Sequence, residues 1–310
     1  MYRYKDAGVD IERGENFSKF ISKKEEIPGW LIQEPTGYAS ILSFTEPPIV
    51  VTTDGIGTKL ILHQRYKRWE DAASDLIAMN YNDIVAVGGE PIAFLDYIGT
   101  SEINDELYEF ARALRKKLSE LGIHLVAGET AEMPGIYTKY WDAVGFAIGI
   151  LKKRLSVESI KEGDTIIGLR SSGFHSNGWS LIRKILSEEK IDPLSLPFDI
   201  LAGTTIYRDV PMVFKELKGI AHITGGGIKR ALRRVLGEKG YRLRIKRSPH
   251  YDWILNYVSF EEVLSTFNMG YGMLLFTDRD KADSICQKLK GEIIGEVLRE
   301  KEEGEITYGN

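Results

Sequence analysis

The segment IVVTTDGIGTK, residues 49–59, joins a strand signal directly to a glycine-rich loop. Residues 49–53 are all β-branched and follow two prolines, and such a run is typical of a buried strand. The run stops at Asp54 and Gly55, so the strand is expected to carry the Asp54 side chain at its carboxyl end. This placement makes Asp54 the first candidate site residue.

The loop after this strand has the composition of a phosphate-binding loop. Small residues let backbone N–H groups approach an anion, and Lys59 supplies a point charge; the small residues are Gly55, Gly57 and Thr58. The spacing differs from the Walker A motif G-x-x-x-x-G-K-[ST], as does that of residues 225–229 (GGGIK). A G-x-G-x-x-G fingerprint is also missing after the strand. These differences exclude the usual P-loop kinases and give no support to nicotinamide-dependent hydride transfer.

Helix and strand signals follow in the first half of the chain. Apolar residues at three- and four-residue spacing predict a helix over residues 73–87, in which Asn80 and Asp83 share one face. A second helix is predicted from a cap at Asn104 to a stop at Gly122. A short strand over residues 123–127 is then expected to present the next two residues, Gly128 and Glu129.

The second half repeats the order strand, glycine loop, helix. Residues 165–178 predict a strand followed by the loop SSGFHSNG, and a helix begins at Trp179. Residues 220–236 repeat this order around three glycines, and residues 266–297 complete an α/β domain. The polar segment 152–163 is the predicted boundary, which gives an N-terminal domain 1–153 and a C-terminal domain 154–310.

Composition excludes several classes of protein. A chain of 310 residues has room for about two domains, and 45 acids against 41 bases (net charge −4) argue against a nucleic-acid partner. No run approaches the roughly 18 apolar residues of a membrane span. The N-terminus lacks the apolar core of a signal peptide, and the single cysteine, Cys286, cannot form an intrachain disulfide. A cytoplasmic location is therefore expected.

Three acids, Asp54, Asp83 and Glu129, lie near glycines or small residues. Oxygen ligands without neighbouring His or Cys suit Mg²⁺, which is usually held by one or two carboxylates plus substrate phosphates. The pattern therefore predicts a metal–nucleotide site. The alternative is that each acid only caps a turn or a helix.

Two histidines lie beside glycine loops. His175 is placed where the loop SSGFHSNG enters a helix N-terminus, which favours an anionic ligand, and it could transfer protons near neutral pH. His222 precedes the three glycines and has the same interpretation. For both residues a purely structural role is the alternative. Cys286 is expected to be a small buried side chain rather than a nucleophile.

Seven motifs occur in order: YKDAGVDI (4–11), TTDGIGTK (52–59), AMNYNDIVAVGGEP (78–91), AGETAEMPGIY (127–137), SSGFHSNG (171–178), AHITGGG (221–227) and TFNMGYGM (266–273). Together they resemble the motifs of the phosphoribosylformylglycinamidine cyclo-ligase family over nearly the whole chain. The resemblance implies a two-domain α/β (α+β) PurM-like fold with a C-terminal mixed sheet flanked by helices. It also implies a homodimer, in which the N-terminal sheets pair into a barrel.

The resemblance further implies ATP-dependent ring closure of a phosphorylated ribonucleotide, with ATP and Mg²⁺ bound in a cleft. It assigns Asp54, Asp83 and Glu129 to metal and nucleotide, Lys59 to phosphate charge, and His175 with Asn177 to the reacting group. Further residues that it implies for ligand binding are Lys5, Asp6, Gly55, Gly57, Thr58, Asn82, Gly128, Gly225, Gly226 and Asn268.

Some segments depart from the family pattern, and two rivals stay open. Residues 35–42 and 203–205 differ where substrate phosphate contacts are expected, and residues 230–234 carry additional arginines. Thiamine-monophosphate kinase is the enzymatic alternative, although the AGETAEMPG and SSGFHSNG motifs fit it poorly. A non-catalytic nucleotide-binding subunit is the other alternative, and the three acids argue against it because binding alone does not require them.

Overall fold

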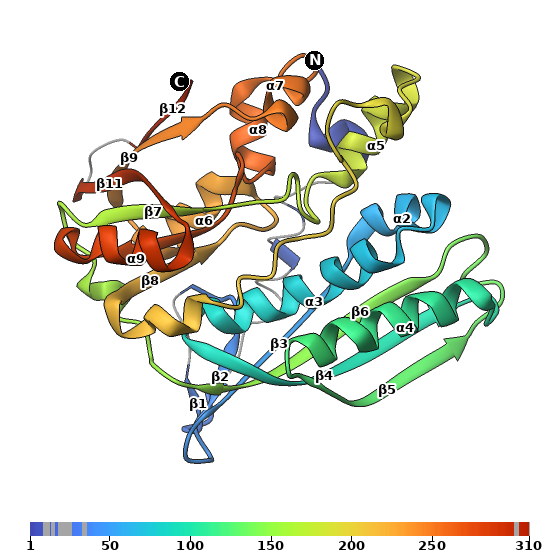
Figure 1. Cartoon of the computed structure of the whole chain (residues 1–310), viewed down its shortest axis with the longest axis horizontal. Helices are drawn as coiled ribbons and strands as arrows, with labels where there is room; N and C mark the ends of the chain where they lie inside the picture. Colours follow the sequence, from blue (N-terminus) through green and yellow to red (C-terminus); the bar gives the residue numbers. More distant parts are fainter. Residues whose placement is uncertain (9–12, 14–15, 18–26, 33–35, 301–303, 310) are drawn as a thin grey trace.

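The computed structural model describes residues 1–8, 13, 16–17, 27–32, 36–300 and 304–309. Two six-stranded sheets divide the chain, each with its own helices (Figure 1). The first sheet uses strands between residues 31 and 151, and the second uses strands between residues 165 and 309. The predicted boundary after residue 153 falls in the segment between the two sheets.

The first sheet has the order β1-β2-β3-β6-β4-β5, and only β4 and β5 are parallel neighbours. Helices α3 and α4 cover one of its faces (Figure 1). Residues of β6 alternate between the two faces, so Ala147 is buried whereas Phe146 is 40% exposed. The elements are β1 (Leu31–Ile32), β2 (Ser40–Leu42), β3 (Ile49–Gly55), α2 (Leu60–Tyr66), α3 (Trp69–Ala86), β4 (Gly89–Thr100), α4 (Asp105–Glu120), β5 (His124–Glu132) and β6 (Asp142–Leu151).

The second sheet has the order β12-β9-β11-β7-β10-β8, and only β12 and β9 are parallel. Every residue of β10 is buried, so helices and loops cover both faces at that strand. The predicted two-domain α/β architecture with a mixed C-terminal sheet is confirmed. The elements are β7 (Thr165–Arg170), α5 (Trp179–Glu188), β8 (Leu217–His222), α6 (Gly227–Leu236), β9 (Lys239–Lys246), α7 (Pro249–Ile254), α8 (Phe260–Thr266), β10 (Tyr271–Thr277), α9 (Ala282–Leu289), β11 (Glu292–Glu300) and β12 (Glu305–Gly309).

Helix α3 is buried along almost its whole length, because residues 72–86 are all buried. The helix contacts the first sheet on one side and β8 of the second domain on the other. Polar side chains on such a helix need internal partners, because burial without a hydrogen bond is costly. Four of them, at positions 75, 80, 82 and 83, find those partners around the candidate site described below.

The prediction for β5 was too short. The strand continues past residue 127 to Glu132, because its parallel pairing with β4 runs on through Gly128 and Glu129. Strand β4 itself was not predicted, because its first residues, Gly89 to Pro91, follow closely on the helix predicted over residues 73–87 and carry no strand signal. Among the described ranges, none of the helices has the length and apolar character needed to cross a membrane.

Candidate active site

Asp54 lies at the end of β3, where α3 fixes its backbone. Asn80 Oδ1 accepts a hydrogen bond from Asp54 N at 2.9 Å, and Asn80 Nδ2 donates to the Asp54 carbonyl oxygen at 3.1 Å. The Asn80 side chain is fully buried. This reciprocal pair of bonds therefore locks the strand end to the helix. Asp83 lies one turn further along α3, and its charge acts on Asp54.

Asp83 and its neighbour Asn82 connect α3 to the second domain. His222 Nδ1, at the end of β8, lies 2.7 Å from Asp83 Oδ1. Asn82 Nδ2 donates to the Thr205 carbonyl oxygen at 2.9 Å, and Asn82 Oδ1 accepts from Tyr207 N at 3.0 Å. The predicted site residues of the two halves therefore meet at the junction between the domains.

The carboxylates of Asp54 and Asp83 influence each other. Burial, followed by the charge of Asp83, raises the pKa of Asp54 to about 6. A divalent cation would relieve this repulsion, and one or two carboxylates are the usual protein ligands of a nucleotide-bound Mg²⁺. These two side chains therefore fit the predicted metal–nucleotide site.

Glu129 lies on β5 of the first sheet, apart from Asp54 within the same chain. Asp54 is opposite Gly145 on β6, and Gly145 is opposite Asp96 on β4. Asp96 is in turn opposite Gly128, so three strand spacings, about 14 Å in all, separate Asp54 from Gly128. A Cβ at Gly128 would lie 2.1 Å from Asp96 Oδ1, so a larger residue there would have to displace this carboxylate. The described residues contain no group of three His, Cys, Asp or Glu that could hold a metal ion.

His175 lies in the loop between β7 and α5 with a φ of 56° and is 1% exposed. Its Nε2 accepts hydrogen bonds from the backbone N–H groups of Ser172 and Thr205 at 3.3 and 3.4 Å. The neutral ring therefore carries its proton on Nδ1, for which no described residue serves as a partner. Burial, followed by the charges of Lys59 and His222, lowers the pKa of His175 to about 3. At pH 7 the ring is neutral and has one unused N–H donor.

Two residues of the TFNMGYGM motif hold the His175 loop. Asn268 Nδ2 donates to the Gly173 carbonyl oxygen at 2.9 Å, and Asn268 Oδ1 accepts from Tyr251 OH at 2.7 Å. Asn268 is 2% exposed, so its side chain positions the His175 loop from inside the protein. A Cβ at Gly272 would lie 2.2 Å from His175 Cε1, and only glycine leaves room for the ring.

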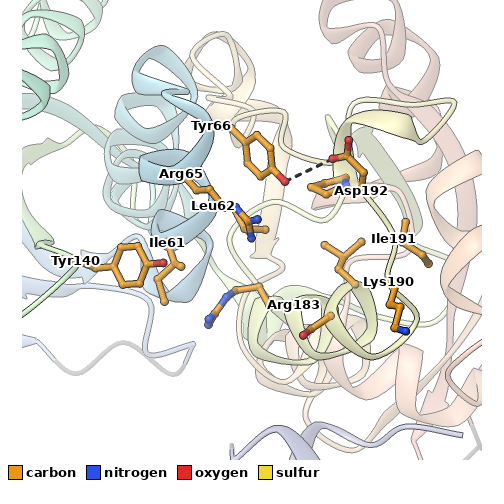
Figure 2. Close-up of a pocket in the computed structure, with 12 residues that line it drawn as sticks. Ile61, Leu62, Arg65, Tyr66, Tyr140, Arg183, Lys190, Ile191 and Asp192 are labelled. Carbon is orange, nitrogen blue, oxygen red and sulfur yellow. Dashed lines mark hydrogen bonds between the residues drawn. The ribbon is translucent and has the colours of Figure 1, made fainter.

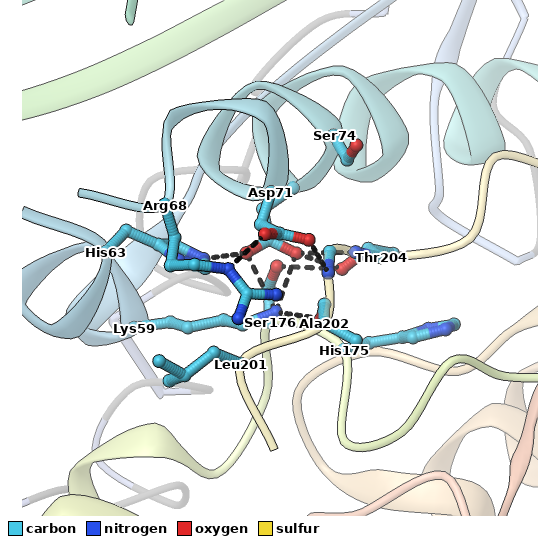
Figure 3. A network of polar contacts seen from close by, with 12 residues as sticks. Lys59, His63, Arg68, Asp71, Ser74, His175, Ser176, Leu201, Ala202 and Thr204 are labelled. Carbon is cyan, nitrogen blue, oxygen red and sulfur yellow. Dashed lines mark hydrogen bonds and ion pairs between the residues drawn. The ribbon is translucent and has the colours of Figure 1, made fainter. Parts of the chain in front are cut away.

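Lys59 is fully buried, and its ammonium pairs with Asp75. Figure 3 shows the Lys59 side chain reaching toward Ala202. Lys59 Nζ lies 3.0 Å from Asp75 Oδ1 and 2.9 Å from Oδ2, and it donates to the Ala202 carbonyl oxygen at 2.7 Å. His63 Nε2 lies 2.7 Å from Asp75 Oδ2. Thr204 donates to Asp75 Oδ1 from its backbone N at 2.7 Å and from Oγ1 at 2.6 Å. In this structure the charge of Lys59 is neutralised inside the protein, whereas the prediction placed it at a phosphate.

The buried Asp75 carboxylate stays ionised within this network. Burial by itself raises its pKa, but the Lys59 ammonium and the His63 hydrogen bond outweigh burial and lower the pKa. Residues 202–205 of the second domain are held against α3 here, because Gly203 N donates to Asp71 Oδ1 at 2.8 Å. The same segment then supplies the Thr205 N–H to His175. Helix α3 thereby positions the His175 loop through residues 202–205.

The loop after Asp54 also contacts the second domain. Thr58 Oγ1 lies 3.1 Å from Ser180 Oγ at the start of α5. Gly57 has a φ of 74°, a conformation that favours glycine. Gly55 N donates to Asp54 Oδ1 at 2.8 Å, so the start of this loop is tied to the candidate metal ligand.

The remaining predicted residues lie around this junction or beyond it. Gly225 and Gly226 form the turn from β8 into α6, and Gly226 has a φ of 93°. Asn177 is half-buried in the His175 loop. Lys5 and Asp6 lie in the short helix η1 (Tyr4–Ala7), which packs on α5. Residues 9–11 of the first motif and Pro35 of the altered segment lie outside the described residues.

Sequence reasoning missed several residues that build this site. Asp75 was hidden inside the 73–87 helix pattern, although an acid between Ser74 and Leu76 on a mostly apolar helix signals an internal partner. Tyr38 is buried beside His222, with ring centroids 6.5 Å apart, and Arg234 lies over its ring at 5.2 Å. Tyr38 precedes the strand signal in a segment without a recognisable period, so nothing in the sequence pointed to it.

The sequence of the chain is similar to known protein families and to individual relatives. Residues 37–151 match the family model "AIR synthase related protein, N-terminal domain", and residues 161–307 match the corresponding C-terminal domain. A phosphoribosylformylglycinamidine cyclo-ligase of Thermoanaerobacter pseudethanolicus is 36% identical, covering 98% of this chain and 99% of the relative.

Solved structures share the fold at low sequence identity. The HypE–HypF complex contains a chain with a TM-score of 0.70 at 19% identity, covering 95% of each chain. AaThiL complexed with AMPPCP and TMP has a TM-score of 0.66 at 15% identity, covering 97% of this chain and 95% of that one. At such identities the likeness concerns the fold alone.

Proposed function

Because the chain belongs to the phosphoribosylformylglycinamidine cyclo-ligase family, we propose that it closes the imidazole ring of 5-aminoimidazole ribonucleotide in purine biosynthesis. The substrates are formylglycinamidine ribonucleotide and ATP, and the products include ADP and phosphate. The observation that carries the proposal is the junction where Asp54 and Asp83 of the first domain meet His222 and the His175 loop of the second.

The chemistry explains why ATP is consumed. An amide oxygen is a poor leaving group, so the γ-phosphoryl group is first transferred to the formyl oxygen of the substrate and ADP is released. The amidine nitrogen then attacks the activated carbon, the new carbon–nitrogen bond closes the ring, and the carbon–oxygen bond breaks to release phosphate. One proton leaves the attacking nitrogen. The protein has to position two phosphorylated ligands and manage that proton.

We assign these tasks to the residues at the junction. Asp54 and Asp83 would hold Mg²⁺ on the ATP phosphates, and the ion would neutralise charge during phosphoryl transfer. His175 is neutral at pH 7, so its Nδ1–H can donate a hydrogen bond to substrate oxygen, and its ring can accept a proton only transiently. Glu129 lies three strands away from Asp54 within the same chain, so its role at the metal and nucleotide stays a prediction.

We also propose that the enzyme is a homodimer in the cytoplasm. The face of the first sheet opposite α3 and α4 contains a cavity of about 800 Å³, lined in part by Leu95, Phe146 and Ile148. A water-exposed apolar surface of this kind favours association with a second copy. Apolar side chains of β4, β5 and β6 are 38–57% exposed, namely Ile92, Leu125, Val126 and Phe146.

One assay tests the proposed reaction. Purified protein is mixed with ATP, Mg²⁺ and formylglycinamidine ribonucleotide, and both ADP and 5-aminoimidazole ribonucleotide are measured. We expect ADP release that depends on the ribonucleotide and matches the imidazole product one to one. The Asp54→Asn variant serves as the control for site chemistry. Consumption of ATP with thiamine monophosphate instead would contradict the proposal.

A further inference from the structure

A second pocket, of about 620 Å³, lies between the two domains (Figure 2). Its first wall consists of α2 and Tyr140, and its second consists of α5 and the segment that follows α5. None of the residues assigned to the active site lines it. The lining residues are Ile61, Leu62, Arg65, Tyr66, Tyr140, Arg183, Leu186, Ser187, Lys190, Ile191, Asp192 and Pro193.

The charge of this pocket is positive. Three cations line it, Arg65, Arg183 and Lys190, and within the described part of the chain none of them forms an ion pair with a carboxylate. The single acid in the lining, Asp192, already accepts hydrogen bonds from Tyr66 OH at 3.5 Å and from Leu194 N at 3.1 Å. The pocket therefore has spare positive charge from both domains.

Arg183 is the residue that most requires an anionic partner. Its side chain is half-buried between α5 and α2, and burial lowers the pKa of its guanidinium group. A cation removed from water without a counter-charge is costly. Figure 2 shows Arg65 extending from α2 and Arg183 extending from α5 toward the space between the helices. Two guanidinium groups on opposite walls suit a phosphate, which accepts bidentate hydrogen bonds.

The rest of the lining suits a planar ring. The phenol rings of Tyr66 and Tyr140 lie on one wall, and the aliphatic side chains of Leu186 and Ile191 lie on the other. The volume falls within the range of about 300–1,000 Å³ that is typical of small-molecule sites. We propose that this pocket binds a phosphate monoester carrying a planar ring, the class of the nucleoside monophosphates, at a site separate from the active site.

A ligand in this position would hold the two domains together. It would contact α2 and α5, and α5 begins directly after the His175 loop. Because a ligand that binds only the folded protein stabilises it, the melting temperature should rise with ligand concentration.

The test uses the full chain with AMP, adenosine and inorganic phosphate in separate calorimetric titrations, in EDTA to remove divalent cations. We expect AMP to bind at least tenfold more tightly than either adenosine or phosphate. Arg183→Gln should weaken AMP binding at least tenfold, whereas the matched control Arg115→Gln, an exposed arginine on α4, should change it less than twofold. Arg183→Gln should retain ATP-dependent turnover and the wild-type circular dichroism spectrum.

Crystals soaked with AMP provide the second measurement, and density between Arg65 and Arg183 is expected. Soaked crystals without AMP in this pocket would overturn the proposal, as would an Arg183→Gln protein that binds AMP like wild type. Phosphate binding as tight as that of AMP would overturn the assigned ligand class. Loss of turnover in parallel with AMP binding would place Arg183 in the active site instead. The titrations do not depend on cyclisation, so the proposed function and this site can fail separately.

Discussion

The Asp54 carboxylate gives the candidate site a measurable pH dependence. A pKa of about 6 leaves the group about 90% ionised at pH 7 and about 10% ionised at pH 5. Only the ionised form binds Mg²⁺, so we expect the affinity for Mg²⁺–ATP to fall about tenfold between these pH values. Calorimetric titrations with Mg²⁺–ATP from pH 5 to pH 8 would show this decrease in affinity. An affinity that stays constant across that pH range would contradict the prediction.

The same carboxylate should lower the stability of the free protein. The folded pKa lies above the ordinary Asp value, so ionisation is harder in the folded state, and the loss of stability is present above about pH 6. Asp54→Asn keeps an oxygen acceptor for Gly55 N and removes the charge. At pH 7 we expect this variant to be more stable by about 1 kcal/mol in urea unfolding, with the gain shrinking near pH 4. A less stable variant at pH 7 would refute the argument.

His175 should stay neutral throughout the physiological pH range. Burial keeps its pKa at about 3, well below that of a free histidine. We expect the imidazole ¹⁵N shifts to report the Nδ1–H tautomer unchanged from pH 8 to pH 5, with His175→Asn used to assign the signal. His175→Ala should lower turnover by about 10²- to 10⁴-fold if the ring takes part in proton transfer. Unchanged turnover of the folded variant would remove His175 from the mechanism.

At the scale of elements, α3 joins the two domains through Asp75. Asp75→Asn would leave the Lys59 ammonium buried without its carboxylate, and we expect a loss of about 3–5 kcal/mol in the free energy of unfolding. Turnover of the folded fraction should also fall, because residues 202–205 hold the His175 loop. The double variant Lys59→Met/Asp75→Leu removes both charges and should recover most of the stability without restoring turnover. Equal stability of Asp75→Asn and wild type would contradict this account.

Most elements of the fold were predictable because their signals are local. The β-branched run before Asp54, the Asn104 cap and the glycine loops of the second half all correspond to observed strands, helices and turns. The Asn104 side chain accepts the expected hydrogen bond, from Leu107 N at 3.2 Å. Strand β4 could not be predicted in the same way, because its Gly-Glu-Pro start resembles a terminator and only pairing with β5 and β6 makes it a strand.

The candidate site was predictable only in part, because some of it depends on contacts between residues that are far apart in the sequence. Asp54 and Asp83 lie near each other because Asn80 fixes the end of β3 to α3, and their motifs already suggested proximity. Glu129 was grouped with them by residue type, and the sheet register places it apart from Asp54 within one chain. The partnership of Lys59 with Asp75 depends on the approach of residues 202–205 from the other domain. A long-range contact of that kind leaves no periodic signal in the sequence.

At the scale of the whole molecule, the open face of the first sheet should determine the oligomeric state. Phe146→Glu places a charge on the open apolar face of the first sheet, and we expect it to convert a dimer into a monomer in light scattering coupled to size exclusion. Tyr108→Glu, on the outer side of α4 with 57% exposure, is the matched control and should leave the mass unchanged. A monomeric wild-type chain, or a dimeric Phe146→Glu variant, would contradict the proposed assembly.

The buried ammonium of Lys59 sets a condition on the catalytic cycle. If this group ever touches a nucleotide, as its motif predicts, it must first exchange Asp75 for the new anion, and the Thr204 contact must loosen with it. Such an enzyme would have one form in which Lys59 pairs with Asp75 and another in which Lys59 pairs with the nucleotide. Binding of the triphosphate would convert the first form into the second.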